Sequence, residues 1–351
     1  MNQNLPISLC MIVKNEEEFL DSSIKSAVVA LGFDDIVVAD TGSTDKTVEI
    51  ALANSARVVS FEWCDDFSAA RNFAAYNAVH DWVFMLDADE RVIEADIGKL
   101  ESFIKENHTV GSFRRIEMTD NAVVNESRLY NRRFYRYDGN IHEQIIPVDT
   151  SRKIVKPAPI VLAHYGYLPD VKTAKSKYER NARLLEEALS KKPDDPYLLF
   201  QLGKCYSVND GNLKKACDYF ERSLAAKEDY RLEYVYYTVE LYGYALINSG
   251  QYEKALEFIG RYGEFYNHKP EFRFLSAHIY QNNGMLQEAV ECYESCIGAD
   301  TYDAKGITSF LSYYNIGVIL ECVGMLEDAV AIYEKCGGYE PAKQRLAELV
   351  K

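Results

Sequence analysis

The chain has 351 residues, of which 48% are hydrophobic and 26% charged, and its formal net charge is −15. This length accommodates about two or three domains with sizeable cores, and the composition is that of an ordered globular protein. The acidic charge argues against a general nucleic-acid binder and against docking on anionic lipid. The first residues lack the basic start of a signal peptide, and no apolar run approaches the ~20 residues that span a bilayer, so we expect a cytoplasmic protein without stable membrane insertion.

Eight cysteines are scattered along the chain, without a CxxC pair and without the Cys/His spacing that is typical of zinc sites. Cysteines outside such patterns are usually small core residues. Cys292 and Cys296 lie four apart on a predicted helix, and we interpret them as core residues of a protein in a reducing compartment.

Residues 1–90 alternate between short apolar runs and helical patterns. Continuous apolar runs are typical of strands that are buried on both faces of a parallel sheet, and right-handed crossovers connect such strands. No GxGxxG follows the first strand and no GxxxxGK[ST] occurs, so neither a dinucleotide fold nor a P-loop is predicted. The predicted strands are 7–13, 35–39, 57–61 and 83–86, and the predicted helices extend to about residue 30 and over 46–54 and 66–79.

The segment WVFMLDADE at 82–90 ends an apolar run with closely spaced carboxylates. Asp87 and Asp89 should lie just past the carboxyl end of a strand, where ligands of open α/β sheets bind. Side chains two residues apart in an extended chain point to one side, so this pair can hold a hard divalent cation, which can bind a diphosphate. For an isolated DxD, a solvated acidic turn is the alternative interpretation.

Beyond residue 90 the pattern becomes mixed. We predict a helix at 97–106, strands at 110–118, 133–137 and 160–164, and turns at 138–140 and 157–159. Two polar clusters, Ile141-His142-Glu143-Gln144 and His164-Tyr165-Gly166-Tyr167, fall in this region, as does a basic cluster of Arg128, Arg132, Arg133 and Arg136.

From residue 172 onward amphipathic helices are predicted throughout, with an internal repeat. A glycine is followed five residues later by an alanine in four places, offset by 39, 34 and 40 residues, which brackets the tetratricopeptide repeat of about 34 residues. The glycine ends a helix and the alanine permits close helix crossing, so we predict four helix pairs and a closing helix at 341–350. The many tyrosines either pack the repeat cores or line a concave face that binds a peptide. The four pairs are Gly211/Ala216, Gly250/Ala255, Gly284/Ala289 and Gly324/Ala329.

Six stretches in this order resemble the family 2 glycosyltransferases of the GT-A fold, in particular a bacterial group with a C-terminal tetratricopeptide region. They are ISLCMIVKNEE, VVADTGSTDKTVEIA, FEWCDDFSAARN, DWVFMLDADE, IHEQ and HYGY. The resemblance implies an α/β GT-A transferase domain at 1–170, a linking helix at 171–192 and an all-α tetratricopeptide solenoid at 193–351.

The resemblance implies a metal site and a catalytic base. Asp87 and Asp89 match the family's DxD motif, which binds a divalent metal, manganese or magnesium, and the ribose-diphosphate of a sugar nucleotide. His164 resembles the distal histidine that completes metal or diphosphate binding in related lipopolysaccharide-core transferases. Glu143 is the candidate general base, by a weaker analogy.

The resemblance also implies a nucleotide pocket. Asp40 and Thr41 match the position that contacts the base and ribose, although many relatives carry a second aspartate in place of Thr41. Arg71 matches an arginine that faces the nucleotide, and Glu16 lies at the tip of the first strand beside the same pocket. Arg132 or Arg133 could help to neutralise the diphosphate or could be solvated strand residues. Asp65, Asp66 and Glu90 are further carboxylates near the site, and we expect Asp66 to cap the helix that follows it.

The expected function is metal-dependent, inverting transfer of a sugar to a peptide or protein that the repeats recruit, with a UDP-linked sugar as the expected donor. Transfer to a lipid-linked or surface saccharide is an alternative, although a basic amphipathic helix for membrane association is not evident. An inactive transferase that acts as an interaction scaffold is another alternative. The sequence leaves the donor sugar, the acceptor and the choice between a monomer and a homo-oligomer open.

Overall fold

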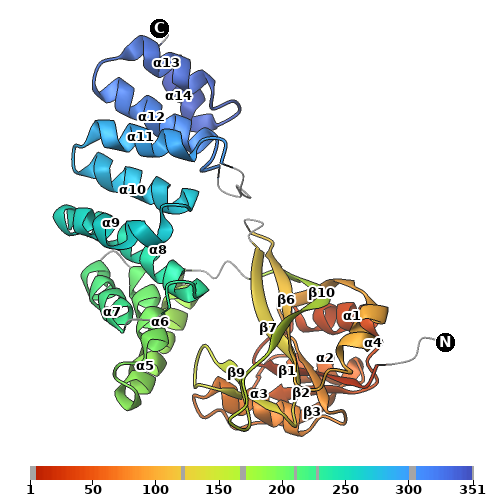
Figure 1. Cartoon of the computed structure of the whole chain (residues 1–351). Helices are drawn as coiled ribbons and strands as arrows, with labels where there is room; N and C mark the ends of the chain where they lie inside the picture. Colours follow the sequence, from red (N-terminus) through yellow and green to blue (C-terminus); the bar gives the residue numbers. More distant parts are fainter. Residues whose placement is uncertain are drawn as a thin grey trace. The chain divides into compact units, whose positions relative to one another are not determined.

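The structure is a computed structural model that describes residues 5–119, 123–166, 171–208, 212–226, 229–299 and 306–349, and of residues 171–177 it gives the backbone. The chain divides into two compact units, Met1–Leu184 and Leu185–Lys351. The division falls within a long helix, α5 (Val171–Lys191) (Figure 1).

The first unit is the predicted α/β domain, and its first four strands lie within a residue or so of their expected bounds. β1 has the predicted bounds. In chain order the elements are β1 (Ile7–Val13), α1 (Leu20–Leu31), β2 (Ile36–Asp40), α2 (Thr47–Ala53), β3 (Arg57–Ser60), α3 (Phe67–Tyr76), β4 (Trp82–Met85), β5 (Glu90–Ala95), α4 (Ile97–Phe103), β6 (Val110–Glu117), β7 (Val123–Asn131), β8 (Tyr135–Asp138), β9 (Gln144–Pro147) and β10 (Val155–His164).

Eight of these strands form one sheet in the order β3-β2-β1-β4-β7-β6-β10-β5, while β8 pairs with β9 in a separate hairpin. Strands β1 to β4 are parallel, β7 is antiparallel to both β4 and β6, and β10 is parallel to β6. The carboxyl ends of β1, β2, β4, β6 and β10 therefore all lie at the same edge of the sheet.

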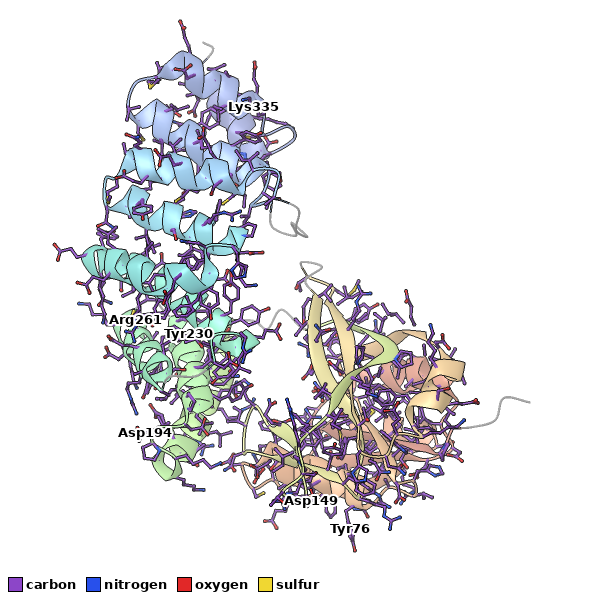
Figure 2. The ribbon with its side chains drawn as sticks, viewed as in Figure 1. Tyr76, Asp149, Asp194, Tyr230, Arg261 and Lys335 are labelled. Atoms are coloured by element: carbon purple, nitrogen blue, oxygen red, sulfur yellow. The ribbon has the colours of Figure 1, made fainter. Side chains whose placement is uncertain are left out.

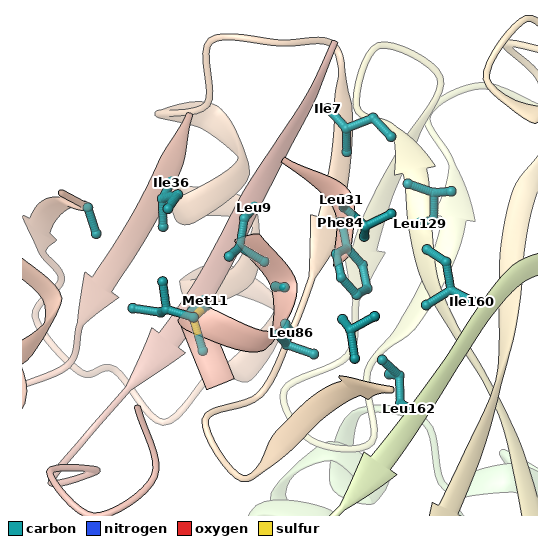
Figure 3. Packing of buried hydrophobic residues seen from close by; sticks show 14 of the residues in the cluster. Ile7, Leu9, Met11, Leu31, Ile36, Phe84, Leu86, Leu129, Ile160 and Leu162 are labelled. Atoms are coloured by element: carbon teal, nitrogen blue, oxygen red, sulfur yellow. The ribbon is translucent and has the colours of Figure 1, made fainter. Parts of the chain in front are cut away.

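Both faces of the sheet carry packed apolar side chains. On one face, Leu9 and Met11 of β1 pack with Phe84 of β4 and with side chains of α1 and α4 (Figure 3). On the other face, Cys10 packs with Ala74 of α3. Successive β1 side chains thus alternate between two cores, as expected for a strand that is buried on both faces.

Three strands, β5, β7 and β9, were not predicted, and β10 begins earlier than expected. The expected turn at 157–159 is wrong, because Pro157 and Pro159 lie within β10. The pairing of β10 with β6 shifts register between Pro157 and Val161. A proline cannot donate to the ladder, so an irregularity of this kind is where a strand tolerates it.

The second unit is the predicted helical repeat region. In the described part of this unit the helices form four successive pairs and a closing helix, after the last residues of α5 (Figure 1). They are α6 (Pro196–Ser207), α7 (Leu213–Ala225), α8 (Glu233–Asn248), α9 (Tyr252–Tyr266), α10 (Pro270–Asn282), α11 (Leu286–Cys296), α12 (Phe310–Cys322), α13 (Leu326–Glu334) and α14 (Glu340–Leu349).

The glycine–alanine pattern has the structural role expected of it. Gly250, Gly284 and Gly324 follow the ends of α8, α10 and α12 with φ of 73°, 73° and 82°, a conformation that glycine adopts without strain. The four alanines of the pattern are fully buried in the second helix of each pair. Gly211 lies outside the described residues.

Aromatic side chains fill the repeat cores. Tyr293 and Tyr333, which follow the pattern alanine by four residues, are at most 1% exposed. Tyr230, which lies before α8 and is labelled in Figure 2, stacks on Phe265 with 4.1 Å between ring centroids. Core packing therefore accounts for these tyrosines. Among the described helices, none is long and apolar enough to cross a membrane.

Candidate active site

The predicted site residues gather at the carboxyl edge of the sheet. β1 lies between β2 and β4, so the chain order reverses there, and ligands of open α/β sheets bind at such a switch point. The DxD segment directly follows β4. His164 ends β10, and Glu117 ends β6 directly beside it in the pairing of the two strands.

Two buried arginines hold the carboxylate of Asp87. Arg71 of α3 donates from Nη1 to Oδ1 at 2.9 Å, and Arg128 of β7 donates from Nη2 to Oδ2 at 2.8 Å. Their side chains are 8% and 5% exposed. Burial alone would raise the pKa of Asp87, but Arg128 and Arg71 lower it well below its usual range. Asp87 is therefore a fixed negative charge.

The charged cluster continues past Arg128. Arg128 also donates to Glu126 at 2.8 Å, and Arg115 contacts the carboxylates of Glu126, Glu90 and Glu117. Glu90 is fully buried, and this burial raises its pKa. Nε and Nη1 of Arg128 are buried without a hydrogen-bond partner in the described part of the chain. Buried donors of this kind bind ordered water or a ligand group.

Glu143, the candidate base, reaches the same cluster from the β8–β9 hairpin. Its Oε1 accepts a hydrogen bond from Nε of Arg71 at 2.5 Å, so one arginine joins Glu143 to Asp87. Asn72, the next residue of α3, positions the hairpin, because its side chain makes two hydrogen bonds with the backbone of Tyr137, at 2.8 and 2.9 Å. The segment Ala70-Arg71-Asn72 therefore supplies Arg71 and, through Asn72, also holds the hairpin that carries Glu143.

Asp89 and His164 form the second predicted pair. Nε2 of His164 lies 3.1 Å from Oδ2 of Asp89, and Nδ1 lies 2.6 Å from Oε2 of Glu117. Hydrogen bonds with Asp89 and Glu117 raise the pKa of His164 to about 9 against the opposing effect of burial. The Asp89 side chain is 35% exposed and that of His164 23%, so solvent reaches this end of the site.

The predicted nucleotide-contacting residues lie in the loops after β1 and β2. The Asp40 carboxylate accepts hydrogen bonds from the backbone of Gly42 and Ser43, and the Thr41 hydroxyl donates to the carbonyl of Val13 at 3.0 Å. The Glu16 backbone N–H donates to Thr47 at 2.7 Å. These bonds tie the two loops together at the edge where Asp87 lies.

The donor chemistry fits a divalent cation that is shared with a diphosphate. The described residues contain no group of three or more His, Cys, Asp or Glu side chains that could hold a metal ion on their own. A cation that also binds substrate phosphates needs only one or two protein carboxylates, and a carboxylate with an imidazole suits a transition metal such as manganese. Asp89 and His164 supply that pair, while both oxygens of Asp87 are bound to arginine.

Of the two interpretations of Arg132 and Arg133, help in neutralising the diphosphate is wrong. Because β7 is antiparallel to β4, residues after Asn131 lie at the amino end of β4, opposite the DxD segment. Arg132 there donates to the carbonyls of Ala75 and Tyr76, and Arg133 is an exposed partner of Asp81. The cap predicted at Asp66 is confirmed, because its carboxylate accepts from the backbone of Ala69 at 2.9 Å.

Several residues of the charged cluster were missed from the sequence: Arg115, Glu117 and Glu126. Arg128 was noted only as part of a basic cluster, and Gly166 only as part of the HYGY segment. The charged residues alternate along β6 and β7, so an available signal was charge at positions that a buried strand would fill with apolar side chains. Tyr167 of the HYGY segment lies outside the described residues.

Comparisons with known proteins agree with the two-part organisation. Residues 8–153 match the family model of Glycosyl transferase family 2, and residues 196–230 and 270–303 match that of the Tetratricopeptide repeat. A TPR repeat-containing protein of Synechococcus elongatus is 35% identical over 236 residues, 62% of this chain and 56% of that protein. The SPbeta prophage-derived glycosyltransferase SunS of Bacillus subtilis is 30% identical over 230 residues, 62% of this chain and 53% of that protein.

The chain thus spans about half the length of these curated relatives. Among solved structures, the crystal structure of S. aureus TarS gives a TM-score of 0.39 at 14% identity, covering 72% of this chain and 54% of that one.

Proposed function

Because the chain carries a glycosyl transferase family 2 domain followed by tetratricopeptide repeats, we propose that it transfers a sugar from a nucleotide-sugar donor to a peptide or protein acceptor. The observation that carries the proposal is the convergence of the DxD carboxylates with Arg71, Glu143 and His164 at the switch point of the sheet. The name of one relative, the glycosyltransferase SunS, also supports the proposal.

The donor nucleotide lies along the carboxyl edge of the sheet in this proposal. Asp40 and Thr41 at the end of β2 and Glu16 after β1 take the base and ribose. Asp87, fixed by Arg71 and Arg128, contacts the ribose-diphosphate. UDP is the expected nucleotide. A site whose charged groups are already held in place loses little freedom when the donor binds, which favours binding.

Asp89 and His164 hold a divalent cation, manganese or magnesium, in the same proposal. When bound, such a cation stabilises the negative charge that develops on the departing diphosphate. The exposure of both side chains leaves coordination positions for the phosphates and for water.

Glu143 accepts the proton of the acceptor nucleophile, and a single displacement inverts the anomeric centre. A base must lie within hydrogen-bond reach of that proton, and Glu143 sits on a hairpin held against α3 beside the arginine that contacts Asp87. The repeats recruit the peptide or protein acceptor, because stacked helix pairs provide an extended binding surface.

The first experiment compares UDP-, GDP- and dTDP-sugars, with and without Mn²⁺, by thermal stabilisation of the full chain and by donor hydrolysis. We expect one donor to respond only with metal, and Asp89→Asn to abolish that response. Asp96→Asn is the matched control, because Asp96 is an N-cap distant from the DxD segment in the fold and asparagine caps equally well. A wild-type chain that responds to no donor would point instead to a scaffold.

A second experiment identifies the acceptor class with the donor found in the first. We expect labelled sugar to appear in peptide or protein and not in lipid extracts. Label confined to a lipid-linked saccharide would contradict the peptide acceptor, while the transferase activity itself would stand.

A further inference from the structure

We infer that Glu117 and Gly166 are positioning residues for His164, which direct its Nε2 towards a cation held together with Asp89. The inference rests on the proposed function, since it concerns the cation of that site. It assigns a role to two residues that lie outside the DxD segment.

Glu117 is the last residue of β6 and pairs with His164, the last residue of β10. Its Oε2 lies 2.6 Å from Nδ1 of His164, while Oε1 accepts from Arg115 at 3.1 Å. The glutamate therefore cannot rotate away without losing both contacts. Its side chain is 21% exposed, so water competes only partly for the same oxygen.

A carboxylate on Nδ1 determines which imidazole nitrogen can bind a metal. When Glu117 accepts the Nδ1 proton, Nε2 is the nitrogen that can bind a cation, and the cation displaces the proton that Nε2 otherwise shares with Asp89. Nε2 is the atom that faces Asp89, at 3.1 Å from Oδ2. Carboxylate–histidine pairs of this type fix the ring and strengthen the nitrogen as a ligand.

Gly166 lies against the imidazole ring of His164. A Cβ placed on Gly166 would lie 2.7 Å from Cε1, closer than real side chains approach, and 3.1 Å from Nε2. The ring would have to move, and Nε2 would move with it. Glycine is therefore required here by the position of the imidazole and not by a left-handed backbone conformation.

This arrangement predicts an effect on metal selectivity. Magnesium takes oxygen ligands, whereas imidazole nitrogen binds transition metals. If Glu117 and Gly166 act through Nε2 of His164, disturbing them should weaken Mn²⁺ binding more than Mg²⁺ binding. A purely structural role would weaken both to the same extent.

The test measures the affinity of the full chain for Mn²⁺ by electron paramagnetic resonance, with Mn²⁺ alone and with UDP, and for Mg²⁺ by competition. Glu117→Leu removes the acceptor, and we expect Mn²⁺ affinity to fall about 10- to 100-fold. Glu117→Gln keeps an oxygen acceptor for Nδ1 of His164, so its Mn²⁺ affinity should fall less than that of Glu117→Leu. Glu106→Gln, an exposed partner of Lys156 before the other end of β6, is the control and should bind Mn²⁺ like wild type.

A double-mutant cycle separates positioning from general damage. Gly166→Ala should lower Mn²⁺ affinity in the wild-type background but add little in the His164→Ala background, because both changes remove the same nitrogen. Equal losses in the two backgrounds, or an unchanged Mn²⁺:Mg²⁺ preference in Glu117→Leu, would overturn the inference while the proposed function stood. A wild-type chain that binds no Mn²⁺ even with UDP would overturn both.

Discussion

The two units bury different kinds of side chain. In the first unit Arg71, Arg128, Glu90 and Asp35 are buried charged residues, with side chains at most 8% exposed. In the described part of the second unit the buried polar residues are uncharged, and the core consists of aliphatic and aromatic side chains. In the first unit, buried ion pairs therefore fix charged side chains in position at the candidate site. In the second unit, apolar packing stabilises the fold, and the charged side chains lie outside the core.

This difference has an energetic consequence. Removing one partner of a buried ion pair leaves an uncompensated charge, whereas a surface pair contributes little. Overfilling a close-packed core costs energy by forcing rings to move. Substitutions of similar size should therefore act by different mechanisms in the two units. Trp63 and Trp82, the two tryptophans of the chain, both lie in the first unit, so their fluorescence reports its unfolding separately.

The largest effect is expected for Arg128→Met. This change removes one of the two arginine partners of Asp87 and one of the two of Glu126, so the buried cluster is left with an excess of negative charge. We expect the first unit to lose about 3–5 kcal/mol of unfolding free energy. Urea unfolding followed by tryptophan fluorescence measures it. Lys254→Met in the second unit, which removes a partly exposed partner of Glu221, is the control and should cost less than about 1 kcal/mol by circular dichroism. Equal losses would contradict the comparison.

The next effect concerns activity. Glu143→Gln keeps the shape of the side chain but cannot take a proton, so we expect kcat to fall about 100- to 1000-fold, roughly 3–4 kcal/mol, with donor binding largely retained. Steady-state kinetics with the identified donor and acceptor would show this split. A loss confined to donor affinity would mean that Glu143 serves Arg71, its ion-pair partner, and not the acceptor proton.

A smaller effect is expected for Gly317→Ala in α12. A Cβ there would lie 2.5 Å from the ring of Tyr333, and this clash should outweigh the gain in helix propensity of about 1 kcal/mol. We expect a net loss of about 1–3 kcal/mol in the helical transition seen by circular dichroism, with the tryptophan transition unchanged. Gly338→Ala, which meets no atom within 4 Å, is the control. Stabilisation by Gly317→Ala would refute the packing argument.

The outcome of the sequence analysis follows the same division. Strands and repeats that are governed by apolar pattern were predicted well, as at β1 and in the glycine–alanine spacing. β7 was missed because Glu126 and Arg128 stand where an apolar pattern would continue, and both belong to the charged cluster. The local pattern failed here at positions where charged side chains replace apolar ones, and these positions belong to the candidate site.

The candidate site was predicted in outline because strand-end motifs place Asp87 and Asp89 at a known edge of a parallel sheet. Glu117 could not be predicted, since its role depends on the pairing of β6 with β10, which are far apart in the sequence. The same holds for Gly166, whose restriction comes from the ring of His164 and not from its own backbone angles. Long-range register is the information that local sequence patterns lack.

The smallest effect is a pH dependence of the first unit. Burial alone would raise the pKa of Asp35, but hydrogen bonds from Ser8, from the backbone of Val79 and from Arg57 lower it. A group with a lowered folded-state pKa stabilises the fold above its unfolded-state pKa of about 3.9, and this stabilisation disappears as pH falls through the folded-state value. Asp35→Asn should therefore lower the unfolding free energy by on the order of 1 kcal/mol at pH 7. The difference in unfolding free energy between the variant and wild type should become smaller below about pH 5. Urea unfolding by tryptophan fluorescence at pH 7, 5 and 4 checks this, and a gap that stays constant would show that Asp35 acts through shape and not through charge.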